Sequence, residues 1–126
     1  MKKKYLWLSV FILGVLSVIY IIKGIFPFGN ESVIWSDMHE QITAIYYHFY
    51  DAIRGNSSLL VDFTSGGGVN FVGILAYYIL SPFTLILLLF PRDLVENAVS
   101  IVVALKILAS GITCLYFLSK TFKKVN

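Results

Sequence analysis

The chain has 126 residues, of which 58% are hydrophobic and 13% are charged, and its mean hydropathy is +0.81. An ordinary soluble domain carries about 25% charged residues. The composition therefore excludes a soluble globular protein and a disordered tail, and the single cysteine excludes a disulfide scaffold. The net charge of +3 is small, and we expect no nucleic-acid partner. The sequence instead predicts an integral membrane protein whose first partner is the lipid bilayer.

Residues 5–26 are the first predicted membrane span. Within them, residues 5–22 form a run of 18 uncharged residues that follows three lysines at positions 2–4. About 20 apolar residues in a helix cross a bilayer core of about 30 Å. The run is longer than the about 7–15 apolar residues of a secretory signal, and no small-residue cleavage site follows it, so we favour an uncleaved span. By the positive-inside rule, the lysines place the N-terminus in the cytoplasm.

Residues 27–70 form the one sizeable polar segment. It holds five carboxylates, one arginine and no lysine, and we place it outside the cell. Apolar side chains recur at helical spacing from Met38 to Ile53, which predicts a helix over 37–54. Three tyrosines at positions 46, 47 and 50 suit a helix at the membrane surface, and Gly55-Asn56 is a typical helix end. We expect the remainder to be loop, with a hinge at the glycine run 66–68.

Two further apolar segments follow, at 71–90 and 98–119. Ser81-Pro82 interrupts the first and predicts a kink there. Lysines follow the second, so three full spans would place them outside, whereas the positive-inside rule asks for both basic ends inside. Two resolutions stay open: residues 71–90 are a re-entrant hairpin about Pro82, or helices beyond this chain settle the topology. We favour three spans, which predicts an all-α membrane fold with about three transmembrane helices and a membrane-surface helix in the outer loop.

The polar segment Ser36-Asp37-Met38-His39-Glu40-Gln41 lies just beyond the first span. Asp37 and Glu40 are three residues apart and would share one face of a helix. Two interpretations fit this spacing: a capping box at the start of a helix, or carboxylates that take a proton from an acceptor hydroxyl or bind a divalent cation. Asp37 and Glu40 are thus the candidate catalytic residues. His39 and His48 lack a tight ligand spacing, so we expect no zinc site and interfacial roles for both.

Lys106 is the one charge inside the last predicted span, nine residues from its start. At about 1.5 Å per residue this is about 13 Å, close to the bilayer midplane. A charge there costs at least about 2.5 kcal/mol and by default faces a bundle interior or a wet cavity; the alternative is a side chain that reaches the interface. We expect its partner on other helices or in a phosphate. We expect Arg54 to pair with Asp51 or Asp62, or to contact a phosphate.

Several short motifs occur in order along the chain. After the basic first span come Phe26-Pro27-Phe28-Gly29, the 36–41 segment, Gly66-Gly67-Gly68-Val69-Asn70-Phe71, Tyr77-Tyr78-Ile79-Leu80-Ser81-Pro82-Phe83, and Leu105-Lys106-Ile107 followed by Ser110-Gly111. In this order and spacing they resemble the opening of YfhO-type bacterial membrane proteins. The resemblance covers nearly the whole chain, but only the N-terminal part of members that are much longer.

The YfhO-type family is similar to GT-C glycosyltransferases, which move a sugar from a polyprenyl-phosphate carrier to an acceptor outside the membrane. The resemblance implies that Asp37 is the catalytic base or a metal ligand in the first outer loop. The cofactor is left open, and a divalent cation is the one option considered. It implies a cell-envelope polymer such as lipoteichoic acid as acceptor. Arg54, Asn70 and Lys106 are the candidate substrate-binding residues, and the two cations would balance the departing phosphate.

The chain stops where a longer family member would continue into further helices. We therefore expect an N-terminal piece that does not catalyse alone and that needs further transmembrane helices. The alternative hypothesis is a small accessory or scaffold membrane protein that packs on a larger membrane partner without catalysis. In that case Asp37 is only a helix cap and Lys106 is a pairing residue.

Overall fold

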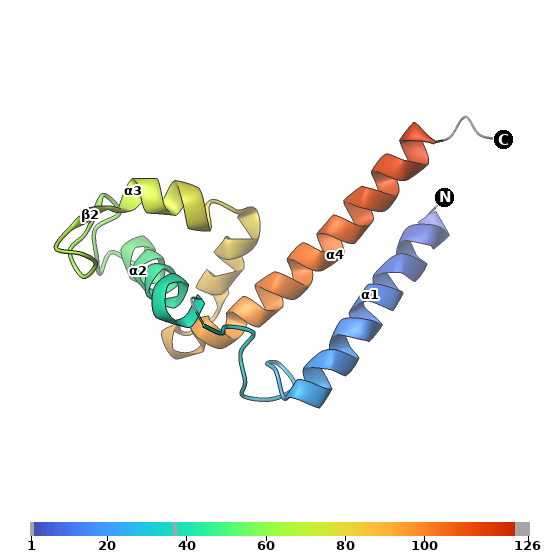
Figure 1. Ribbon diagram of the computed structural model, residues 1–126, viewed down its shortest axis with the longest axis horizontal. Helices are drawn as coiled ribbons and strands as arrows, with labels where there is room; N and C mark the ends of the chain where they lie inside the picture. Colours follow the sequence, from blue (N-terminus) through green and yellow to red (C-terminus); the bar gives the residue numbers. More distant parts are fainter. Residues whose placement is uncertain (1, 37, 123–126) are drawn as a thin grey trace.

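The computed structural model describes residues 2–36 and 38–122 and is mostly helical (Figure 1). Two long helices, α1 (Lys2–Lys23) and α4 (Val95–Thr121), lie side by side. Both are apolar and long enough to cross a membrane. The 22 residues of α1, at about 1.5 Å each, extend over about 33 Å, close to the thickness of a bilayer core. The predicted all-α membrane fold is therefore confirmed.

The two long helices run antiparallel. Near the start of α1, the hydroxyls of Tyr5 and Ser119 lie 3.4 Å apart, and near its end the Tyr20 hydroxyl donates to the Ser100 carbonyl oxygen over 2.8 Å. The start of α1 thus meets the end of α4, and the end of α1 meets the start of α4. Both ends of the described chain lie at the same end of this hairpin (Figure 1).

Helix α1 ends at Lys23, three residues before the predicted limit of the first span. Gly24 follows with φ +62°, a left-handed conformation that glycine adopts without steric cost. The chain then turns back on itself, because Glu31 donates its N–H to the Gly24 carbonyl over 2.9 Å. At Gly29 a Cβ atom would overlap the Gly24 backbone, so this turn needs a residue without a side chain.

Residues 30–90 form a cap that covers the start of α4 (Figure 1). Its elements are the π-helical turn η1 (Met38–Ile42), α2 (Thr43–Ile53), β1 (Val61–Asp62), β2 (Val69–Asn70), α3 (Phe71–Ile74), the π-helical turn η2 (Leu75–Ile79) and the 3-10 helix η3 (Pro82–Leu89). A short 3-10 turn, η4 (Arg92–Leu94), then leads into α4. The described cap has a helical body with one small hairpin attached.

The hairpin pairs β1 with β2 antiparallel, with Val61 opposite Asn70 and Asp62 opposite Val69. The sequence predicts a loop in this region, and the structure instead shows a short pair of strands. All three glycines of the run 66–68 have positive φ, so they form the tight reversal that brings the two short strands together. The glycine run therefore forms the turn of the hairpin.

The apolar segment 71–90 is broken, as the sequence predicts. Its two halves, Phe71–Ile79 and Pro82–Leu89, meet at an angle of 101°. Ser81 is extended, and Pro82 opens the second half, because proline disfavours a helical conformation in the residue before it. The bent pair is either one broken span or a re-entrant loop, so the chain has two or three candidate spans.

The buried face of α2 differs from the predicted one. The predicted stripe included Ile53, which is 46% exposed, whereas Tyr46 and Tyr50 are buried. Tyr50 also donates its hydroxyl to the Phe90 carbonyl over 2.9 Å. These two rings therefore pack inward against the rest of the cap and α4, and the place of the helix at the membrane surface stays a prediction. The core consists of the following buried apolar residues: Ile34, Tyr46, Phe49, Tyr50, Phe71, Ile79, Leu87, Val95, Ala98, Val99 and Val102.

Candidate functional site

The segment predicted to carry chemistry lies between the end of α1 and the body of the cap. Asp37, its central residue, lies outside the described residues. Ser36 has φ 54°, a left-handed conformation that costs a non-glycine residue about 1–2 kcal/mol. Its carbonyl oxygen accepts from the N–H groups of His39 and Glu40, at 2.8 and 3.3 Å. The chain therefore makes a tight, strained turn where the sequence concentrates its polar groups, and such strain is common at functional sites.

Three hydrogen bonds fasten the approach to this turn onto the start of α4. Ser32 donates its hydroxyl to the Glu96 carbonyl over 3.0 Å, and Ser100 accepts on its hydroxyl from the Val33 N–H over 3.1 Å. Asn97 also donates its amide to the Asn30 carbonyl over 2.9 Å. The first two turns of α4 therefore hold residues 30–33, which lead into the 36–40 segment.

Glu96 is a site residue that sequence reasoning missed. Its Oε1 lies 3.2 Å from Nδ1 of His39, whose side chain is 60% exposed. Glu96 lies in the first turn of α4 and is 57 positions from His39 along the chain, so no local pattern points to the pair. Glu40 is exposed. The described part of the site thus presents one imidazole and two carboxylates on an accessible surface.

An ion pair beside this surface ties α2 to the turn that precedes α4. Arg92 donates to both carboxylate oxygens of Asp51, with its Nε at 2.9 Å from Oδ1 and its Nη2 at 2.9 Å from Oδ2. The hydrogen bonds from Arg92 lower the pKa of Asp51, and partial burial opposes this. The Arg92 guanidinium also lies over the Tyr47 ring, 4.9 Å from its centre. Burial, and next the negative charge of Glu96, raise the pKa of Tyr47.

The structure contradicts the ion pair expected for Arg54. Asp51 is bound by Arg92, and Asp62 lies beside His48. Arg54 instead donates from Nη2 to the Leu88 carbonyl over 3.1 Å, and its guanidinium lies over the Tyr50 ring, 4.5 Å from the centre. Since the end of α2 packs against η3, the carbonyl lies within reach of Arg54, and both nearby carboxylates are engaged elsewhere.

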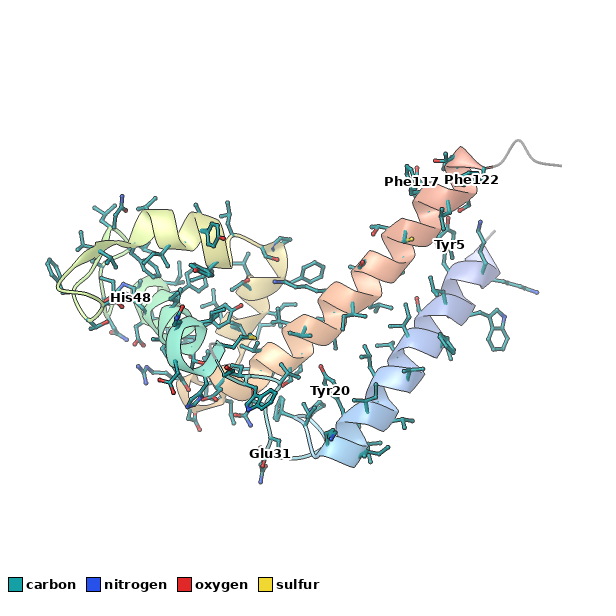
Figure 2. The ribbon with its side chains drawn as sticks, viewed as in Figure 1. Tyr5, Tyr20, Glu31, His48, Phe117 and Phe122 are labelled. Atoms are coloured by element: carbon teal, nitrogen blue, oxygen red, sulfur yellow. The ribbon has the colours of Figure 1, made fainter. Side chains whose placement is uncertain are left out.

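A second polar cluster lies on the side of the cap away from α1, where Figure 2 labels His48. Nδ1 of His48 is 3.4 Å from Oδ1 of Asp62, and Nε2 donates to the Ser58 carbonyl over 2.8 Å. Burial raises the pKa of Asp62, but hydrogen bonds from Thr64 and Ser65 outweigh it, and the net shift is downward. His48 was expected at an interface, yet its side chain is 9% exposed. Through these contacts His48, on α2, holds the loop that follows α2 and the first strand of the hairpin.

Asn70 has a structural role in the described chain. Its side-chain oxygen accepts from the N–H groups of Val72 and Gly73, at 3.1 and 3.4 Å. It is thus the N-cap of α3, satisfying donors that the first turn of a helix leaves free. The structure does not bring Asn70 to the 36–40 segment.

Lys106 lies on an exposed position of α4. On α4, Gly111 packs against Ile12 of α1, and at 100° per residue Lys106 lies on the opposite side of the helix from that contact. The pairs that join the two helices place Lys106 near the level of Leu16, about 10 Å along the axis from Lys23. Counted along α4 itself, which begins at Val95, Lys106 lies 11 residues, or about 16 Å, from the start of the helix. Its place at the bilayer midplane stays a prediction.

No group of three or more histidine, cysteine, aspartate or glutamate side chains that could hold a metal ion occurs among residues 2–36 and 38–122. The carboxylates of the described cap lie apart from one another. Asp51 pairs with Arg92, and Asp62 lies beside His48. Asp37, the expected ligand of a divalent cation, lies outside the described residues.

Two apolar antiparallel helices with a helical cap over one end define an integral membrane protein with two to three candidate spans. The family model for the bacterial membrane protein YfhO matches residues 9–126. The chain therefore belongs to the YfhO family of bacterial membrane proteins, and the resemblance seen in its motifs is confirmed. No curated protein and no solved structure matches the chain.

Proposed function

We propose that this chain is the N-terminal part of a GT-C-like glycosyltransferase that transfers a sugar from a polyprenyl-phosphate carrier to a cell-envelope acceptor such as lipoteichoic acid. The observation that carries the proposal is the anchoring of residues 30–33, which lead into the 36–40 segment, to the start of α4. Ser32, Val33 and Asn97 make the contacts that hold them there. In the proposed arrangement, a carboxylate in this segment would lie close to the outer end of a membrane span, within reach of a lipid-linked sugar at the bilayer surface.

Asp37 is the proposed base. It would take the proton of the acceptor hydroxyl while that oxygen forms a bond to the anomeric carbon of the sugar, and the bond from this carbon to the carrier phosphate breaks. The lipid phosphate departs as an anion, so no acid is needed to protonate it. Attack from the face opposite the leaving group inverts the sugar carbon. The side chains of His39 and Glu96, which lie 3.2 Å apart, would order the acceptor.

The proposed orientation follows from the hairpin. Since α1 and α4 run antiparallel, Lys3 and Lys120 lie at the same end, and the positive-inside rule places both in the cytoplasm. The cap then lies outside, and residues 71–89 enter and leave the membrane from that side without crossing it. This is the re-entrant alternative, and it removes the conflict between the basic ends without any further helix.

The test of the proposed function is the substitution Asp37→Asn in the native protein. Asparagine keeps a good helix cap but removes the base, so we expect transfer of labelled sugar in membranes to fall by about a hundredfold or more. Asp93→Asn, at an exposed position of η4, is the matched control and keeps activity. Full transfer by the Asp37→Asn protein, at normal membrane levels, would rule out this role.

A second candidate function rests on Lys106. A cation exposed on the side of α4 away from α1 suits a scaffold or accessory role, in which the hairpin packs on the helices of a larger partner. An immunoblot of native membranes with an antibody against residues 27–70 separates the two. A product many times larger than 14.2 kDa favours the enzyme, and a band of that mass with a co-purifying membrane partner favours the scaffold.

A further inference from the structure

The stretch between Arg54 and Arg92 is almost free of charge. Its residues 55–91, called here the uncharged lobe, include one charged side chain, that of Asp62. At the about 25% of an ordinary soluble domain, a stretch of this length would carry about nine. The uncharged lobe comprises the β1–β2 hairpin and the two halves of the bent pair. It therefore lacks the charged surface that ordinarily faces water.

The one carboxylate of the uncharged lobe is turned inward. Asp62 is 2% exposed, and its Oδ1 lies 3.4 Å from Nδ1 of His48, whose side chain is 9% exposed. Its two oxygens also accept hydrogen bonds from the Thr64 N–H and the Ser65 hydroxyl, over 2.8 and 2.9 Å. A buried carboxylate is costly unless it is paired and hydrogen-bonded, and here the chain supplies both. The outer surface of residues 55–91 therefore presents no ionised group.

Large apolar side chains cover much of this outer surface. In the hairpin, Phe63 is 77% exposed and Leu60 is 67% exposed. In the bent pair, Tyr77 and Leu80 are 81% and 76% exposed. The hairpin leads directly into the bent pair, because β2 runs into α3 (Figure 1). A continuous exposed apolar surface of this kind marks a contact with lipid or with protein.

The two arginines that bound the uncharged lobe both lie at the end of α2. Arg92 binds both carboxylate oxygens of Asp51, and Arg54, three residues after Asp51, donates to the Leu88 carbonyl over 3.1 Å. Both arginines are exposed. An arginine at the border of an apolar region keeps its charge in the headgroup layer, where anionic phosphates attract it. An uncharged surface bordered by two cations thus fits a lipid surface, in which apolar tails lie beside anionic phosphates.

The backbone of the hairpin sets its depth. Among the described residues, its two strands pair only with each other, so the outer edge of each carries N–H and carbonyl groups without a strand partner. Open sheet edges of this kind do not occur in the hydrocarbon core, where no water satisfies them. The hairpin therefore suits the headgroup layer, and the bent pair beside it suits the greater depth.

We propose that the β1–β2 hairpin anchors the cap in the lipid headgroup layer, with Leu60 and Phe63 inserted among the lipids. Arg54 and Arg92 then lie at the level of the lipid phosphates. The inward position of Asp62 follows from this placement, because a carboxylate on the outer surface would face lipid. The proposal depends on neither sugar transfer nor the side of the membrane on which the cap lies.

The test is the accessibility of spin labels on single cysteines at Leu60 and Phe63, in a Cys114→Ser chain in nanodiscs of phosphatidylcholine and phosphatidylglycerol. Oxygen concentrates in lipid and a chelated nickel ion stays in water, so collisions with each report the surroundings of the label. We expect oxygen collisions to exceed nickel collisions at both positions. The control is a label at Glu31, an exposed residue of the turn after α1, where we expect nickel collisions to dominate.

Two other results would each overturn the proposal. Nickel collisions that exceed oxygen collisions at positions 60 and 63 would place the hairpin in water. Few collisions with either reagent would mean that protein covers the hairpin, whether a further transmembrane helix or a second copy of the chain.

A pair of substitutions at Phe63 tests the anchor directly. Phe63→Glu places a charge among the lipids, so we expect the label at position 60 to shift toward water. Phe63→Leu keeps an apolar side chain and should leave that label in lipid. Unchanged circular dichroism and an unchanged label at position 31 exclude unfolding as the cause. A label at position 60 that stays in lipid in the Phe63→Glu chain would also overturn the proposal.

Discussion

The Tyr20 hydroxyl, near the end of α1, donates to the Ser100 carbonyl oxygen 2.8 Å away, where α4 leaves the cap. Ser100 is fully buried, and its own hydroxyl accepts from the Val33 N–H. One residue of α4 thus holds the end of the first long helix and the segment that leads to the candidate site. The packing of the two long helices and the position of the candidate site therefore both depend on Ser100. We expect a substitution there to affect both.

Replacing Tyr20 by phenylalanine removes this bond and keeps the ring. We expect a loss of about 0.5–1.5 kcal/mol in the free energy of unfolding in detergent, the usual net contribution of one hydrogen bond. Tyr5→Phe is the control, since its contact with Ser119 is 3.4 Å long and only partly buried. Equal losses from the two variants would contradict the special role of Tyr20.

Ser100→Ala should cost more than Tyr20→Phe, because it leaves the partly buried Val33 N–H without its partner. An unsatisfied buried donor costs about 1–3 kcal/mol. Limited proteolysis of the 30–36 segment measures the effect directly, and we expect faster cleavage there. Unchanged cleavage would show that Ser32 and Asn97 suffice to hold the segment on α4.

The re-entrant topology predicts that the two chain ends lie on one side of the membrane. In a Cys114→Ser background, single cysteines at Lys3, Asn56 and Thr121 can be labelled in intact cells with a membrane-impermeant maleimide. We expect labelling at position 56 and none at positions 3 and 121 until the cells are opened. Labelling at position 121 in intact cells would mean that residues 71–89 cross the membrane and that there are three spans.

The Asp51–Arg92 pair makes docking of α2 on α4 sensitive to acid. Arg92 lowers the pKa of Asp51 below 3.8, its value in the unfolded chain. The stabilisation is therefore complete above pH 3.8 and is lost as the pH falls through the lower folded value. Because Arg92 is largely exposed, we expect only about 0.2–1 kcal/mol.

The measurement is the melting temperature of the purified protein from neutral pH down to about pH 3, for the native chain and for Asp51→Asn. The difference in melting temperature between the native chain and Asp51→Asn should narrow as the pH falls. The native chain then loses the ion pair with Arg92, which the variant never had. A gap that stays constant across this range would exclude a contribution from the ionised Asp51.

Two glycines of the first third of the chain should respond to alanine in opposite ways. A Cβ at Gly29 would overlap the Gly24 backbone, whereas a Cβ at Gly14, inside α1, meets nothing within 4 Å. We expect Gly29→Ala to cost about 1–3 kcal/mol, as overpacking does, and Gly14→Ala to gain about 0.5–1 kcal/mol in helix stability. Thermal unfolding in detergent measures both, and a neutral Gly29→Ala would show that the turn relaxes.

Two features of the cap could be predicted because each depends only on residues next to it in the chain. The kink at Ser81-Pro82 follows from the chemistry of proline, and the end of α2 follows from Gly55, which has φ +82°. Arg54 could not be placed in the same way. Its partner among Asp51, Asp62 and a backbone carbonyl depended on where η3 and Arg92 lie, and these positions are set by contacts between distant segments.

The amino-acid sequence was enough to predict a helical membrane protein, because hydropathy and terminal lysines are properties of single segments. Its motifs also indicated the YfhO family. Contacts between distant segments were needed to establish that α1 and α4 run antiparallel and that His39 meets Glu96. Each of these depends on residues brought together from far apart along the chain. Such meetings arise from the packing of whole helix faces, which no short stretch of sequence specifies.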